Sequence, residues 1–244
     1  MSGWAAKRFW TAADVAEVEG EGKGGGGFTV QLDGRPVKTP ARAALVVPTR
    51  AMAQAIAAEW DAQEGKVDPG SMPVTRSANA AIDKVTHQHA EVAGLIAAYG
   101  DSDHICYRAE APAELVRRQA EGWDPLLDWA AAEFGGRLIP VQGVMHSPQP
   151  AAALAPMTAA VHAMDAFTLT AFHDLVSLSG SLVIGFAALR DHAAPDALWA
   201  LSRIDEKWQA ELWGADDEAE ALAARKESDF LHAKRFYDLA RRVN

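Results

Sequence analysis

The sequence contains one cysteine, no excess of basic residues and no long apolar run. Cys106 is the single cysteine among 244 residues, which excludes an internal disulfide framework and zinc sites built on paired cysteines. Its apolar neighbours indicate a small buried thiol. The net charge of −10 disfavours nucleic acid or an anionic membrane as the main partner, because a basic face supplies the affinity for both. A basic or mixed-charge protein surface is the easier partner.

Membrane and export signals are also missing from the pattern. The longest apolar run, 179–189, is followed by Arg190 and is too short to span a bilayer. The amino-terminal stretch MSGWAAKRFW lacks the apolar core of a secretory signal, and the acidic residues that soon follow it argue against a transit peptide. We therefore expect a cytoplasmic protein with no membrane insertion.

The chain changes character after its first 48 residues. Asp33-Gly34 is a strong hairpin signal, and 13–20 and 44–48 provide further candidate strands. Helical spacing then predominates. Thr49 is placed to cap a helix over 50–63 and Pro73 to begin another; later helices are predicted over 87–99, 112–134, 151–164, 166–190, 195–213 and 216–241. The stretch 135–150 is a long break that has room for a short strand.

This order predicts an α+β protein with two domains. Residues 1–86 form a small α+β domain with at least one β-hairpin, and residues 87–244 form a larger all-helical domain. The turn WDPLLDW at 123–129 places two tryptophans on one amphipathic stretch, which is typical of core or domain-junction packing.

Some segments resemble motifs for phosphate binding, metal binding or nucleophilic catalysis, but the residues around them do not fit those motifs. The segment 20–25 matches G-x-G-x-x-G but runs into a strand instead of opening a helix, so we interpret 20–27 as a flexible hairpin loop. His87 and His89 point in opposite directions on a helix and cannot share a metal ion. The serines of SLSGSL (177–182) lack a G-x-S-x-G context. We therefore expect no cofactor and no metal.

Two polar groups have structural explanations. Thr75, Asn79 and Asp83 recur every four residues and form a polar stripe, for which a solvated helix face is the ordinary interpretation and a chemical site the alternative. Asp101 and Asp103 lie close to Arg108 in the sequence and are expected to pair with a cation or to cap a helix.

The segment RIDEKWQAELWGADDEAE, 203–220, combines two tryptophans with many carboxylates. On a helical wheel the predicted core stripe comprises Ile204, Trp208 and Leu212. Gly214 is placed to end the helix. The acids at 216–218 then open the next helix, where negative charge complements the helix dipole, so they need no functional explanation.

Glu206 has no such explanation. It lies with Gln209 and Trp213 on a different side of the predicted helix. An acid beside an exposed aromatic favours a protein-contact surface, because tryptophan anchors interfaces and a carboxylate orients a partner's arginine or lysine. The alternative is an enzyme of unknown reaction that uses Glu206 as acid or base. That alternative requires a deep pocket with a second titratable group, and Asp205 points about 100° away.

Eight segments, taken together and in order, resemble a known family. They are RFW (8–10), LDGRPVKTPAR (32–42), LVVPT (45–49), AIAAEWDAQ (55–63), MPVTRSANAAID (72–83), CYRAEAP (106–112), WDPLLDW (123–129) and RIDEKWQAELWG (203–214). The set is similar to the assembly chaperones of the F-type ATP synthase catalytic head, found in mitochondria and alphaproteobacteria. The resemblance spans nearly the whole chain.

The resemblance implies a non-enzymatic chaperone that binds the free alpha subunit of ATP synthase and prevents its aggregation before alpha pairs with beta. It implies a small α+β domain followed by a helical domain, no cofactor, and a partner-binding role for Asp205, Glu206 and Gln209, with Glu211 and Trp213 as weaker candidates. We expect a monomer when free, in the cytoplasm for a bacterial member and in the mitochondrial matrix for eukaryotic relatives. The glycine-rich loop at 20–27 departs from the family pattern.

Overall fold

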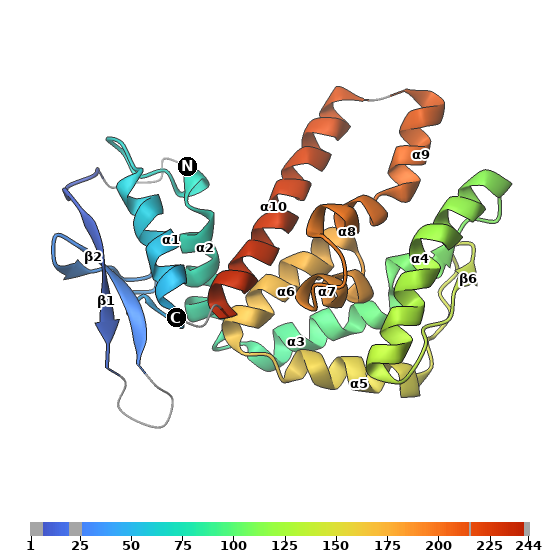
Figure 1. Cartoon of the computed structure of the whole chain (residues 1–244), viewed down its shortest axis with the longest axis horizontal. Helices are drawn as coiled ribbons and strands as arrows, with labels where there is room; N and C mark the ends of the chain where they lie inside the picture. Colours follow the sequence, from blue (N-terminus) through green and yellow to red (C-terminus); the bar gives the residue numbers. More distant parts are fainter. Residues whose placement is uncertain (1–6, 20–25, 215, 242–244) are drawn as a thin grey trace. The chain divides into compact units, whose positions relative to one another are not determined.

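The chain forms two compact units in the computed structural model, which describes residues 7–19, 26–214 and 216–241 (Figure 1). The first unit comprises Met1–Gln88, Ala166–Ala171 and Arg235–Asn244, and the second comprises His89–Asp165 and Phe172–Lys234. Strands are concentrated near the amino terminus and helices follow, so the predicted α+β class is confirmed. The sequence pattern gave no sign that two later segments group with the first unit.

The first unit is built on an antiparallel sheet. Strand β1 (Ala13–Val18) pairs with β2 (Gly27–Leu32), and β2 also pairs with β3 (Arg35–Pro36) and β4 (Val46–Val47). The turn between β2 and β3 places Asp33 and Gly34 at φ 47° and 79°, which is the left-handed geometry that Asp-Gly hairpins require. The predicted hairpin and the further strands are therefore confirmed.

Helices α1 (Arg50–Asp61) and α2 (Pro73–Ala80) follow the sheet in this unit, with a short 3₁₀ turn, η1 (Pro69–Ser71), between them and a π-helical turn, η2 (Ala81–Val85), after them. The Thr49 side chain accepts from the N–H of Met52 at 3.1 Å, as a helix cap does, and α2 begins at Pro73 as predicted. Apolar faces of sheet and helices share one core, which includes Trp10, Val30, Met52, Ile56, Val74 and Phe236.

The predicted solvated stripe on α2 is wrong. Thr75 is buried, and the Glu59 carboxylate of α1 accepts from its backbone N–H at 2.8 Å and its hydroxyl at 2.7 Å. Asp83 accepts from the Thr39 hydroxyl at 2.6 Å, and Asn79 is half-buried. Thr75 and Asp83 can be withdrawn from solvent because groups distant in sequence satisfy their hydrogen bonds.

The second unit is helical except for one parallel pair of short strands, β5 (Tyr107–Arg108) and β6 (Val141–Gln142). Its helical elements are α3 (His89–Ala97), η3 (Ala98–Ser102), η4 (His104–Cys106), α4 (Ala113–Phe134), α5 (Ala151–His162), the latter part of α6 (Ala166–Ser179), α7 (Leu182–Leu189), α8 (Pro195–Leu201), α9 (Ile204–Trp213) and most of α10 (Asp217–Arg241). Among the described residues, no helix has the length and apolarity needed to cross a bilayer.

Two long helices predicted from the sequence are each broken in the structure. The 166–190 helix stops at Gly180, which adopts φ 72°, and α7 restarts with the Ser181 side chain accepting from the N–H of Ile184 at 3.0 Å. The 195–213 helix is interrupted at Ser202 and Arg203, between α8 and α9. These breaks turn the chain so that α7 is entirely buried, which a single straight helix would not allow.

Trp123 of α4 lies at the centre of this unit. Its side chain is fully buried and its indole N–H donates to the carbonyl of Leu201 at 2.8 Å. The Arg108 guanidinium lies 5.2 Å from the ring centre. The packing role predicted for 123–129 is confirmed for Trp123, and Cys106 is also buried; burial raises the pKa of the Cys106 thiol.

Asp103 joins the start of η4 to the start of α7. It is fully buried, and its carboxylate accepts from the N–H of Ile105 at 3.2 Å and of Val183 at 3.0 Å. The predicted capping role is confirmed, whereas Arg108 pairs with Asp124 at 2.8 Å. Burial raises the pKa of Asp103 to about 6 from an ordinary value of 3.8, against the opposing effect of its hydrogen bonds.

This burial predicts a pH-dependent stability. The folded state holds the Asp103 proton more tightly than the unfolded state, so the free energy of unfolding falls as pH rises from about 4 to about 6. A pKa displaced from 3.8 to about 6 corresponds to a loss of up to about 3 kcal/mol across that window. In Asp103→Asn this contribution disappears. Urea unfolding of wild type and Asp103→Asn at a series of pH values measures this difference. If the free energy of unfolding depends on pH in the same way for both proteins, the prediction is contradicted.

Candidate protein-binding surface on helix α9

Helix α9 lies against α4 along one side. Ile204 packs over Gly122, where an added Cβ would come within 2.8 Å of the Ile204 side chain, and the Arg118 guanidinium lies 4.8 Å from the centre of the half-buried Trp208 ring. Leu212 is 55% exposed, so the prediction that it belongs to the core stripe is wrong. Helix α9 contacts α4 along one side only, and no residue of α9 is fully buried, so the stripe that packs against α4 is narrow.

Two of the predicted partner-binding acids are used to hold α9 against α4. The Asp205 carboxylate accepts from the Gln119 side-chain amide at 2.6 Å, and the Gln119 carbonyl in turn accepts from the N–H of Ala109 at 2.8 Å. The Glu211 carboxylate pairs with Arg118 at 2.7 Å. Asp205 and Glu211 therefore position the helix, and the sequence provided no sign of the α4 residues that bind them.

The other three predicted residues share the side of α9 that points away from Ile204. Glu206, Gln209 and Trp213 fall within about 60° of one another at 100° per residue, and all three are exposed. Trp213 is 78% exposed. Glu206 pairs with Arg203 at 2.7 Å; the Glu206 side chain is 47% exposed and the Arg203 side chain 21%, so the carboxylate remains accessible to a partner's cation.

The helix ends and the next one begins as the sequence predicts. Gly214 adopts φ 89° and its N–H donates to the carbonyl of Ala210 at 2.9 Å. The Asp216 carboxylate accepts from the N–H groups of Glu218 at 2.8 Å and Ala219 at 3.1 Å, which caps α10. The roles of Gly214 and Asp216 are thus accounted for by backbone needs, whereas the exposure of Trp213 is not.

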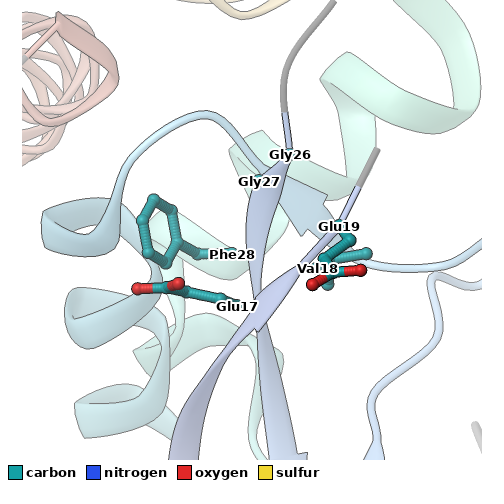
Figure 2. Close-up of a pocket in the computed structure, with 6 residues that line it drawn as sticks. All are labelled: Glu17, Val18, Glu19, Gly26, Gly27 and Phe28. Atoms are coloured by element: carbon teal, nitrogen blue, oxygen red, sulfur yellow. The ribbon is translucent and has the colours of Figure 1, made fainter. Parts of the chain in front are cut away.

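An enzyme that uses Glu206 would need a pocket around that residue. The hollow shown in Figure 2 lies elsewhere, where β1 ends and β2 begins, and is lined by Glu17, Val18, Glu19, Gly26, Gly27 and Phe28. Arg50 pairs with Glu17 and lies over the Phe28 ring. The hollow contains none of the predicted site residues. Of the predicted glycine-rich loop, residues 20–25 lie outside the described part of the chain.

The two histidines do not share a helix as predicted, because His87 lies in the turn that precedes α3 and His89 is the first residue of α3. His87 is exposed, and the His89 ring nitrogen lies 2.6 Å from the carbonyl of Met164. Within residues 7–19, 26–214 and 216–241, no three side chains of the metal-binding types gather closely enough to hold an ion.

Comparison with known proteins identifies the family. The family model described as ATP12 chaperone protein matches residues 7–131. The chain is 47% identical to the crystallised Atp12 of Paracoccus denitrificans, with a TM-score of 0.91 over 97% of this chain and 99% of that one. An aspartate-to-lysine mutant of that protein matches with 47% identity and a TM-score of 0.93 over 98% and 100% of the two chains.

A more distant relative gives the same answer. The mitochondrial protein atp12 of Schizosaccharomyces pombe is 24% identical over 228 residues, which is 88% of this chain and 76% of that protein. The matched proteins carry the name of a chaperone family and no enzyme name. The chain belongs to the ATP12 chaperone family, the ATP synthase assembly chaperones that its sequence segments resemble.

Proposed function

We propose that this chain binds the free alpha subunit of ATP synthase and prevents its aggregation until alpha pairs with beta. A subunit that awaits assembly exposes apolar surface, and a protein that covers this surface lowers the concentration of the aggregation-prone species by mass action. Competition from the beta subunit for the same surface is then sufficient for release, so the chain needs no nucleotide hydrolysis. We place this activity in the cytoplasm of a bacterium.

The observation that carries the proposal is the exposed Trp213 beside Glu206 on a helix that is fixed to its domain. A tryptophan that is 78% exposed contributes little to folding but offers a large, rigid apolar contact to a partner. Glu206 supplies a carboxylate for an arginine or lysine of the client, and Gln209 supplies an amide on the same face. Because Asp205 and Glu211 bond to α4, the surface is held in place before binding, which reduces the entropic cost of association.

The proposal is tested by co-purification with separately expressed alpha and beta subunits. Wild type should capture alpha. Glu206→Lys should capture it at least tenfold more weakly, because the substitution places a positive charge against the arginine or lysine of the client. Circular dichroism should show both proteins folded, since the substituted Glu206 side chain is exposed.

Asp128→Lys is the matched control. Asp128 is also an exposed acid on a helix of the second unit, paired with Arg137 at 2.8 Å, and it lies outside α9. It should capture alpha as wild type does. If folded Glu206→Lys captures alpha as well as wild type does, Glu206 is not part of the client-binding surface. If folded wild type captures neither subunit, the proposed function is refuted.

A further inference from the structure

The amino-terminal half of α10 extends beyond the core of its unit. From Asp217 to Asp229 no side chain is fully buried, and the first buried residue of the helix is Phe230. Thirteen residues correspond to about 20 Å of helix. A helix of this length gains most of its stability from packing and not from its own propensity. Figure 1 shows the start of this half near the end of α9, with the two helices apart along the rest of their length.

An apolar stripe continues into this exposed half. Phe230 packs against Trp199 of α8 with 5.6 Å between ring centres, and Ala233 is buried one turn further on. Leu222 lies within about 80° of Phe230 around the helix, so it extends the same side, and it is 49% exposed. On α9, Trp213 and Leu212 are 78% and 55% exposed. Three large apolar side chains therefore remain uncovered on one helix pair.

The same segment concentrates negative charge. Residues 203–220 hold seven acidic and two basic side chains, a net charge of −5 out of −10 for the whole chain. Asp217, Glu218 and Glu220 have no ion-pair partner among the described residues. Two copies of this surface would repel each other, and nucleic acid would be repelled as well. The charge and the exposed apolar side chains together fit a protein segment that is basic and amphipathic.

We propose that α9, residues 204–213, and the exposed half of α10, residues 217–229, together form one docking surface for a basic amphipathic segment of the client. Leu212, Trp213 and Leu222 bury apolar side chains of that segment. The acids at the start of α10 pair with its arginines and lysines. The inference rests on the proposed function, and it adds α10 and the charge of the recognised segment to it.

Two variants of α10 test this surface while leaving α9 intact. Leu222→Ser should weaken binding of purified alpha about tenfold at any salt concentration, because it removes apolar area from the contact. Glu218→Lys combined with Glu220→Lys should weaken binding strongly at low salt and little at high salt, because the attraction between exposed charges is screened. Titration calorimetry at low and high salt measures both effects.

Matched controls come from α3. Leu95 is an exposed leucine, 64% exposed, and Glu91 is an exposed acid on the same helix. Leu95→Ser and Glu91→Lys should bind alpha as wild type does. Circular dichroism and urea unfolding should show all variants folded, since each substituted side chain is exposed.

The outcomes separate this inference from the proposed function. If the folded α10 variants bind alpha as wild type does, and high salt does not weaken binding, the docking surface is refuted while the chaperone function stands. A folded wild type that binds no alpha would overturn the function itself. Sedimentation provides the third outcome: a wild-type dimer that Leu222→Ser converts to a monomer would assign the surface to a second copy of the chain and refute a client segment.

Discussion

Trp213→Ala should weaken binding of the alpha subunit about 10- to 100-fold and leave the stability of the chain unchanged. Interface tryptophans are frequent hot spots, for which truncation costs about 2 kcal/mol or more of binding free energy. The same side chain is 78% exposed in the free chain, so its removal should change the free energy of unfolding by no more than about 0.5 kcal/mol. The effect on binding and the effect on folding are therefore expected to separate.

Titration calorimetry with purified alpha subunit and urea unfolding provide the two measurements. Met145→Ala is the control, because Met145 is also a highly exposed apolar side chain, 81% exposed, but lies in the loop after β6. It should bind alpha as wild type does. If Trp213→Ala binds alpha with wild-type affinity, α9 does not supply the anchor, and the exposed tryptophan requires another explanation.

Trp123→Ala should have the opposite profile, a loss of about 3–5 kcal/mol in the free energy of unfolding. Trp123 is fully buried, so its removal leaves a cavity that surrounding side chains fill only partly. It also leaves the carbonyl of Leu201 without the indole donor that lies 2.8 Å away. A loss of this size is a large fraction of the stability of a typical domain, so circular dichroism at physiological temperature should show the helical signal reduced.

Trp123→Phe keeps the prediction testable when the alanine variant does not fold. Phenylalanine retains much of the apolar volume but has no N–H, so a smaller loss of about 1–3 kcal/mol is expected. Urea unfolding followed by circular dichroism measures it. Wild-type stability for either variant would contradict the central position that the structure assigns to Trp123.

Local signals in the sequence were sufficient wherever a short stretch decides its own backbone. Asp33-Gly34 determines a left-handed turn, Thr49 provides a cap and Gly214 ends a helix, and each of these features appears in the structure. The order of strands and helices follows from such signals together with hydrophobic periodicity. The family resemblance needed no structure either, because it depends on the order of segments along the chain.

Long-range contacts decided which polar residues are available to a partner. The sequence offered Asp205, Glu206 and Glu211 as partner-binding candidates on one helix. The structure separates them, because Gln119 and Arg118 of α4 bind Asp205 and Glu211. Thr75, which the stripe pattern placed in solvent, is buried because Glu59 accepts its hydrogen bonds. Helical periodicity shows which residues share a side but not which side is covered.

The sequence alone determined the α+β class, the hairpin, the starts and ends of several helices and the family of the chain. The tertiary structure decided that Leu212 is exposed, that α6 and α7 are separate helices, and that Glu206, Gln209 and Trp213 are exposed on α9. The physical reason is the range of the interactions. Turns and caps depend on residues a few positions apart, whereas burial and side-chain pairing depend on elements that only folding brings together.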